Sequence, residues 1–75
     1  MSSKSDRRSI RTKKELKDNL IALLSTGRII ESISVKELAD LADISRSTFY
    51  LHYSDIYDLL DDIENDFFDE FRSVF

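Results

Sequence analysis

The sequence predicts an all-α protein built as one small domain. Its 75 residues include no proline and a single glycine, so the turn-forming residues on which an all-β chain depends are missing. Apolar residues recur at helical spacing in four segments, which are residues 12–27, 35–42, 45–53 and 54–75. A chain of this length buries only about 60% of the surface that its unfolded form exposes, so it can hold a single core.

The first predicted helix occupies residues 12–27. Thr12 and Glu15 have the spacing of a capping box, in which two side chains satisfy free backbone N–H groups at a helix start. Gly27 suits a left-handed C-cap that ends the helix. The apolar stripe of this helix consists of four leucines, Leu16, Leu20, Leu23 and Leu24.

Residues 28–33 connect this helix to the next one. The isoleucines of the segment are expected to fill the core, and these are Ile29, Ile30 and Ile33. A β-strand is the alternative for this segment, although the sequence offers no partner strand.

Start signals within residues 34–53 predict the next two helices. Ser34 precedes Glu37 by three residues, which makes a second capping box, and Ile33 can pack as a staple on Leu38. Apolar residues then follow at the spacing of one helix face, namely Val35, Leu38, Ala39 and Ala42. This helix is therefore expected to pack against the core.

The second of these helices begins at Ser45, whose side-chain oxygen can cap the backbone N–H of Thr48. Its one large apolar anchor is Phe49, onto which Ile44 can staple. The residues around this anchor are mostly polar, namely Arg46, Ser47, Thr48, Tyr50 and His52. A packed helix and a presented helix joined by a short turn predict a helix-turn-helix, whose second helix can enter the DNA major groove. An ordinary helical corner is the alternative.

The run SVKELADLADISRSTFYLHYSDIYDLL resembles the DNA-reading half of the TetR family of bacterial transcriptional regulators. The residues that close the recognition helix in that family correspond here to Thr48, Phe49, Tyr50, His52 and Tyr53. Residues 11–27 are similar to the first helix of the family, so the resemblance covers most of the chain. It implies a three-helix, homeodomain-like helix-turn-helix domain over residues 12–53, the start of a fourth helix, and the function of a repressor.

The resemblance also implies which residues contact double-stranded DNA. Those expected to face the groove are Lys36, Arg46, Ser47 and Tyr50, and those expected near the backbone are Ser34, Thr48, Leu51 and His52. The chemistry of the side chains suits these roles. Arg46 can donate to O6 and N7 of guanine, whereas hydroxyl and imidazole groups can donate to phosphate oxygens. For Tyr53 we favour packing in the core.

Three departures from the family pattern affect these expectations. Asp43 stands where the family usually has a turn glycine, but Asp tolerates a left-handed conformation better than most residues. Ile56 replaces a lysine that clamps a phosphate in the family, which puts one backbone contact in doubt. Family members continue into a helical ligand-binding domain, whereas this chain ends at Phe75. The resemblance thus implies a fragment, or a protein without its sensor, and a homodimer formed through a C-terminal region absent here.

Charge is segregated along the chain, whose formal net charge is −4. Residues 1–52 hold ten Lys/Arg against seven Asp/Glu, or +3, whereas residues 53–75 hold one against eight, or −7. A basic first part and an acidic last helix suit a protein that presents one face to the phosphate backbone. Residues 1–11 are polar and aperiodic, so we expect a basic flexible arm. The arm is either a solvated tail or lies on phosphates or in a minor groove.

The fourth predicted helix occupies residues 54–75. Ser54 or Asp55 is expected to cap it, and Asp58 is favourably placed near its positive N-terminus. Its apolar stripe consists of Ile56, Leu59, Leu60, Ile63, Phe67, Phe71 and Val74, and outside the stripe lie Tyr57, Phe68 and Phe75. So much aromatic surface is expected to face something outside this chain. The alternative function is therefore a helical protein-interaction module that uses this acidic, Phe-rich helix.

Other chemistry is not expected. His52 is the single histidine, and no pattern shapes an oxyanion hole around it, so we predict no enzyme. The acids of residues 58–70 lack the Gly-bearing loop of a calcium site, and we interpret them as a solvated face without metal or cofactor. The longest apolar run, LIALL at residues 20–24, is too short for a membrane span. The absence of Cys agrees with a cytoplasmic setting.

Overall fold

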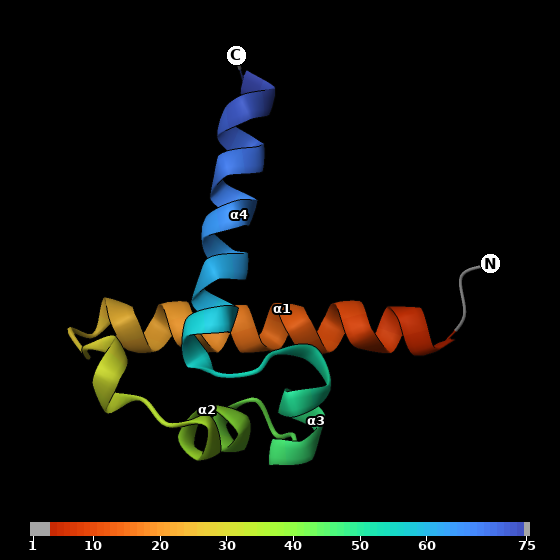
Figure 1. The fold of residues 1–75 in the computed structure, drawn as a ribbon, viewed down its shortest axis with the longest axis vertical. Coiled ribbons are helices and arrows are strands. Elements are labelled where there is room, and N and C mark those ends of the chain that lie inside the picture. Colours follow the sequence, from red (N-terminus) through yellow and green to blue (C-terminus); the bar gives the residue numbers. More distant parts are fainter. Residues whose placement is uncertain (1–3, 75) are drawn as a thin grey trace.

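A computed structural model describes the backbone of residues 4–74 and the side chains of residues 7–69. Its elements are α1 (Lys4–Ser25), the short 3-10 helix η1 (Ile30–Ser32), α2 (Val35–Leu41), α3 (Arg46–His52) and α4 (Ile56–Val74). Figure 1 shows α2 and α3 packed on one side of the long α1, while α4 crosses α1 and extends away on the other side. The all-α prediction is confirmed for residues 4–74, which contain no strand.

The core draws on every α-helix of the described chain. Its fully buried large side chains are Leu16 and Leu20 of α1, Leu38 of α2, Phe49 of α3 and Leu59 of α4. Around them pack Ile33, Ala42, Tyr53, Ile56 and Ile63, all at least nine-tenths buried. The predicted three-helix domain therefore exists, and the first half of α4 belongs to its core.

The start of α1 differs from the prediction. Residues 4–11 are helical, so the predicted flexible arm is wrong for them, and Thr12 lies inside the helix instead of capping it. The segment holds no Pro or Gly, and its Lys and Arg residues favour helix, so nothing in it stops the helix at Thr12. Arg11 also forms an ion pair with Glu15 one turn later, at 3.6 Å. Residues 1–3 of the predicted arm lie outside the described residues.

Side-chain caps start the three later helices. Ser34 Oγ accepts the backbone N–H of Glu37 at 3.0 Å, and Ser45 Oγ accepts that of Thr48 at 3.1 Å, as predicted. Asp55 caps α4, because its Oδ1 accepts the backbone N–H of the residue three positions later at 2.8 Å. Each cap satisfies a backbone donor that would otherwise lack a partner, which fixes where α2, α3 and α4 begin.

In the capping box predicted at Ser34, the carboxylate of Glu37 would accept from the backbone N–H of Ser34, but it forms an ion pair instead. Both carboxylate oxygens of Glu37 accept from the guanidinium of Arg28 at 2.9 Å. This bidentate hydrogen bonding lowers the pKa of Glu37 and raises the pKa of Arg28. The pair ties the segment before η1 to the start of α2.

The connecting segment forms η1 instead of a strand. Ile33 is buried and Ile30 packs against the core, as expected. The expectation is wrong for Ile29, whose side chain is 65% exposed. The 3-10 turn explains the difference, because Ile29 lies before η1 in an extended conformation, where its side chain points away from the core.

Two backbone positions with positive φ shape the turns. Gly27 ends α1 at φ 95°, and Asp43 adopts φ 59° in the turn between α2 and α3. Both were predicted to take this left-handed conformation. At Asp43 it directs the chain so that the next backbone N–H, that of Ile44, donates to the carbonyl of Ala39 at 2.9 Å. This turn sets the angle at which α3 leaves α2.

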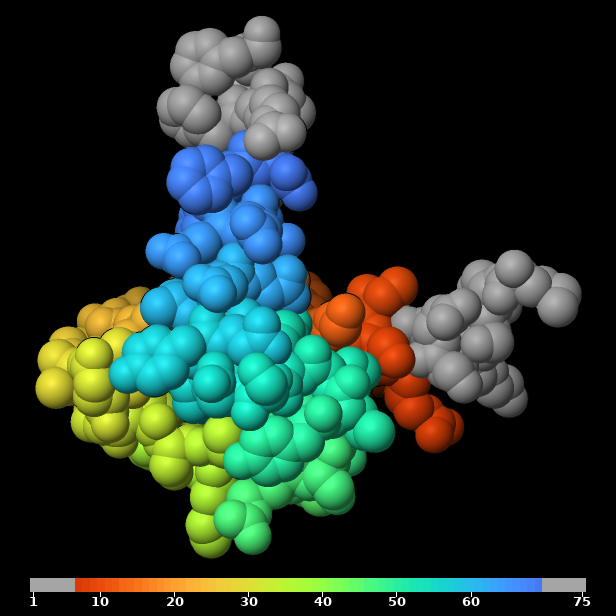
Figure 2. Space-filling view, in the orientation of Figure 1, coloured from red at the N-terminus to blue at the C-terminus, as the bar shows by residue number. Residues whose placement is uncertain are grey.

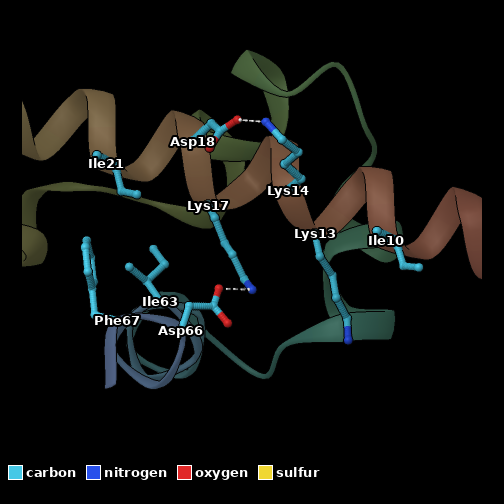
Figure 3. A pocket seen from close by; sticks show the side chains of 9 residues that line it. All are labelled: Ile10, Lys13, Lys14, Lys17, Asp18, Ile21, Ile63, Asp66 and Phe67. Atoms are coloured by element: carbon cyan, nitrogen blue, oxygen red, sulfur yellow. Dashed lines mark hydrogen bonds and ion pairs between the residues drawn. The ribbon is translucent and has the colours of Figure 1, made fainter. Parts of the chain in front are cut away.

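A polar tie joins α1 to α4 and to the end of α3. Lys17 Nζ lies 2.6 Å from a carboxylate oxygen of Asp66 (Figure 3). It also lies 3.3 Å from a carboxylate oxygen of Asp62. Tyr53, buried as predicted, donates its hydroxyl to Asp62 at 2.6 Å. The bond from Tyr53 lowers the pKa of Asp62, against the effect of burial, and Lys17 lowers it further. Burial and the bond to Asp62 raise the pKa of Tyr53. These groups satisfy one another, so the tie holds α4 across α1.

Candidate nucleic-acid interface

The outer face of α3 is an exposed and largely polar surface of the helix-turn-helix. Phe49 is fully buried and anchors α3 to the core. The side chains that point outward are those of Arg46, Ser47, Tyr50 and Leu51, with Tyr50 54% and Leu51 80% exposed. In Figure 2, the green atoms of α3 lie at the lower end of the view, away from the blue atoms of α4. A helix held by one anchor and open on its other sides can enter a groove of a partner.

Arg46 stands at the start of this face. No acidic side chain of residues 7–69 forms an ion pair with it, and α3 itself contains no acid. A guanidinium without an internal partner keeps its five donors available to an external acceptor. Tyr50 lies one turn later, and its ring packs edge-on against Phe49 with 5.4 Å between centroids. The ring position is thus fixed by the core, while much of the side chain remains exposed.

Three hydroxyl groups gather at the first turn of α3. Ser45 Oγ lies 3.1 Å from Ser47 Oγ and 2.9 Å from Thr48 Oγ1. These contacts orient the hydroxyls of Ser47 and Thr48 with respect to the cap. Ser47 is exposed and Thr48 is half-buried. The sequence predicts the cap but not this cluster, which depends on side-chain rotamers.

The other side of α3 forms a surface hollow with the start of α1. Its walls are Arg8, Ser9 and Thr12 from α1 and Thr48, Leu51 and His52 from α3. The structure therefore brings three of the predicted site residues together with three that sequence analysis did not assign to the site. The one-turn spacing of Arg8 and Thr12 could have indicated a shared face, but only if the helix is known to start before residue 12.

The two predicted site residues of α2 lie apart from this hollow. Ser34 caps α2, and its hydroxyl hydrogen remains free to donate because the oxygen accepts from the backbone. Lys36 is exposed and pairs with Asp40 at 3.2 Å. Such surface pairs contribute only about 0–1 kcal/mol, so Lys36 can exchange this partner for another anion. The structure thus divides the predicted site residues among the α3 face, the hollow and the start of α2.

A second exposed surface lies between α1 and the outer part of α4. Phe67 and Phe68 are 62% and 66% exposed, and Ile10 and Ile21 of α1 are also exposed. Figure 3 shows Ile21 and Phe67 bordering a groove that Lys17 and Asp66 cross. The predicted surplus of aromatic surface is confirmed for these two phenylalanines. The side chains of Phe71 and Phe75 lie outside the described residues.

Together these features define a helix-turn-helix domain. Two short helices, α2 and α3, are joined by residues 42–45, the first packs against α1, and the second presents a polar face. Within residues 4–74, no helix has the length and apolar character needed to cross a membrane.

The comparison with known proteins agrees with this class. The chain is 38% identical over 52 residues to an uncharacterized HTH-type transcriptional regulator, YxbF of Bacillus subtilis strain 168. The matched stretch covers 69% of this chain but only 13% of that protein, so the chain spans a small part of its relative. No protein-family model matches the chain, and no solved structure was found to match it. The match supports a helix-turn-helix regulator.

Proposed function

We propose that the chain is the sequence-specific DNA-binding domain of a TetR-like transcriptional regulator that acts as a repressor. The observation that carries this proposal is the outer face of α3, where Arg46, Ser47 and Tyr50 are exposed around the buried anchor Phe49. The printed name of the relative supports transcriptional regulation, and the resemblance of residues 34–60 to the TetR family supports the family and the repressor role.

Residues 45–52 read an operator half-site in the major groove. Arg46 donates two hydrogen bonds to O6 and N7 of a guanine, because a guanidinium matches this pair of acceptors. Ser47 and Tyr50 contact the neighbouring groove edge, while Lys36 approaches from α2. Backbone contacts come from Ser34, Thr48, Leu51 and His52, of which the polar three can donate to phosphate oxygens.

Stable operator binding uses two such domains. Helix-turn-helix dimers contact two half-sites about one turn of DNA apart, and linking two heads raises avidity by ~10² or more. We propose that a C-terminal region beyond this chain joins two copies. A single 75-residue domain then binds its half-site weakly.

A second candidate function is favoured by the exposed phenylalanines of α4. Phe67 and Phe68, flanked by acids, would suit a helical module that binds another protein. This alternative uses α4 as the contact surface and leaves the face of α3 without a ligand.

The test is selection of bound duplexes from a random pool, followed by affinity measurement on the selected site. We expect a defined base preference that Arg46→Ala relaxes at one position. Arg11→Ala is the matched control, because it removes the same charge from an exposed site on α1 and should leave the base preference unchanged. Recovery of random sequences by the wild-type chain would refute sequence-specific binding.

A further inference from the structure

The hollow between α1 and α3 has the chemistry of an anion site. It is an open depression of about 500 Å³ lined by Arg8, Ser9, Thr12, Thr48, Leu51 and His52. These side chains supply one guanidinium, three hydroxyls and one imidazole, and none is acidic. By contrast, the groove between α1 and α4 includes Asp18 and Asp66, and the depression at the start of α2 includes Glu37 and Asp40. In a chain with net charge −4, a polar hollow without carboxylates favours a negatively charged ligand.

The two helices place these groups in facing pairs. Arg8 and Thr12 are one turn apart on α1, and Thr48 and His52 are one turn apart on α3, so each pair lies on one face of its helix. Arg8 is exposed at the rim, whereas Thr12, Thr48 and His52 are half-buried. A ligand in the hollow would thus be reached by donors from both walls. The arrangement requires α1 to begin before Arg8, and its first residue is Lys4.

We propose that this hollow binds one phosphodiester group of the DNA backbone, held jointly by α1 and α3. Arg8 supplies the positive charge, the hydroxyls of Thr12 and Thr48 donate hydrogen bonds, and His52 donates through an imidazole N–H. The proposal rests on the proposed function, because an α3 that lies in the major groove has its flank beside the sugar-phosphate backbone. It adds α1 to the interface and assigns Arg8, rather than the arm as a whole, to a defined phosphate.

A phosphate held by two helices would set the register of α3. Phosphate contacts fix the orientation of a protein on the duplex, while base contacts read the sequence. Loss of Arg8 should therefore weaken binding to all duplexes alike, in contrast to loss of Arg46. Loss of Arg8 should thus lower affinity for every duplex, whereas loss of Arg46 should change the base preference.

The first measurement is the salt dependence of affinity for Arg8→Ala on the selected duplex. One lost phosphate contact should reduce the slope of log K against log salt by about one. Arg7→Ala is the matched control, because Arg7 is an exposed neighbour with the same charge that does not line the hollow. Thr12→Val should cost about threefold to tenfold in affinity, as expected for one lost hydrogen bond. Circular dichroism checks that each variant remains folded.

The second measurement places a neutral methylphosphonate at one backbone position of the duplex at a time. At one position the wild-type chain should lose affinity while Arg8→Ala loses little more, since the partner of the phosphate is already gone. An unchanged salt slope for Arg8→Ala, or additive losses at every position, would overturn the phosphate site. If binding nevertheless depends on Arg46, the proposed function stands and only this site fails. If the wild-type chain binds no duplex, both proposals fail.

Discussion

Polar groups on the two sides of α1 differ in whether they are paired with other groups of the protein. On the α4 side, Lys17, Asp62 and Tyr53 are paired with one another at 2.6–3.3 Å and are partly or largely buried. On the α3 side, Arg46 and Tyr50 are exposed, and Arg46 has no ion pair with residues 7–69. Paired groups of the first kind hold the helices together, whereas free donors of the second kind cost nothing in water and remain available to a ligand. The contrast therefore separates Lys17, Asp62 and Tyr53, which stabilise the fold, from Arg46 and Tyr50, which we assign to DNA.

The largest expected effect comes from the anchor that makes the α3 face possible. Phe49→Ala should lower the free energy of unfolding by about 3–5 kcal/mol, because it empties a fully buried site. Domains of this size have only about 5 kcal/mol of stability, so the variant should be largely unfolded at 25 °C. Leu51→Ala, on the exposed face of the same helix, should change stability by less than about 0.5 kcal/mol. Urea denaturation compares the two, and equal losses would contradict the distinction between anchor and face.

The second expected effect is a loss of DNA affinity without a loss of stability. Arg46→Ala should cost about 1–3 kcal/mol of affinity for the selected site, while its free energy of unfolding stays within about 0.5 kcal/mol of wild type. The reason is that the guanidinium forms no ion pair within residues 7–69. Parallel titration with duplex and with urea measures both quantities. A large loss of stability would show that Arg46 stabilises the fold, which would contradict its assignment to DNA alone.

The tie between α1 and α4 should appear as a pH dependence of stability. The pKa of Asp62 is lowered in the folded chain, so its contribution is present above the ordinary carboxylate pKa and is lost as pH falls through the folded value. Asp62→Asn should therefore flatten the decline in unfolding free energy below about pH 5 and cost about 1 kcal/mol at pH 7. Glu37, also with a lowered pKa, leaves a residual decline in the variant. Asp61→Asn, at an exposed neighbouring position, should keep the wild-type profile; a flattened profile there would contradict the assignment.

The smallest effects are expected at the two turns with positive φ. Gly27→Ala should cost about 1 kcal/mol from backbone strain alone, because a Cβ there would meet no atom within 4 Å. Asp43→Gly should stabilise by about 0.5 kcal/mol, since glycine adopts φ 59° without strain. Thermal unfolding measures both changes, and the same sign for the two would show that strain does not govern these turns.

Local signals explain what could be predicted from the sequence. Ser34 and Ser45 start their helices as expected, and Asp43 makes the turn, because caps and turns depend on residues only a few positions apart. The same reasoning misplaced the start of α1, since the motif of Thr12 and Glu15 also fits the interior of a longer helix. Neighbouring residues could not show the tie between Lys17 and Asp66, which are 49 positions apart. The hollow lined by Arg8 and His52 could not be predicted for both reasons. The start of α1 was misplaced, and the two residues are far apart in the sequence.

The central claim is that α3, with the start of α1, is the surface that contacts DNA. Titration of the labelled chain with the selected duplex, followed by backbone amide NMR, tests it most directly. We predict shifts concentrated at residues 45–52 and near Arg8 and Thr12, with further shifts at Ser34 and Lys36 at the start of α2. The amides of residues 61–69 in α4 should remain unchanged. Shifts centred on Phe67 and Phe68, or no shifts with any duplex, would contradict the account.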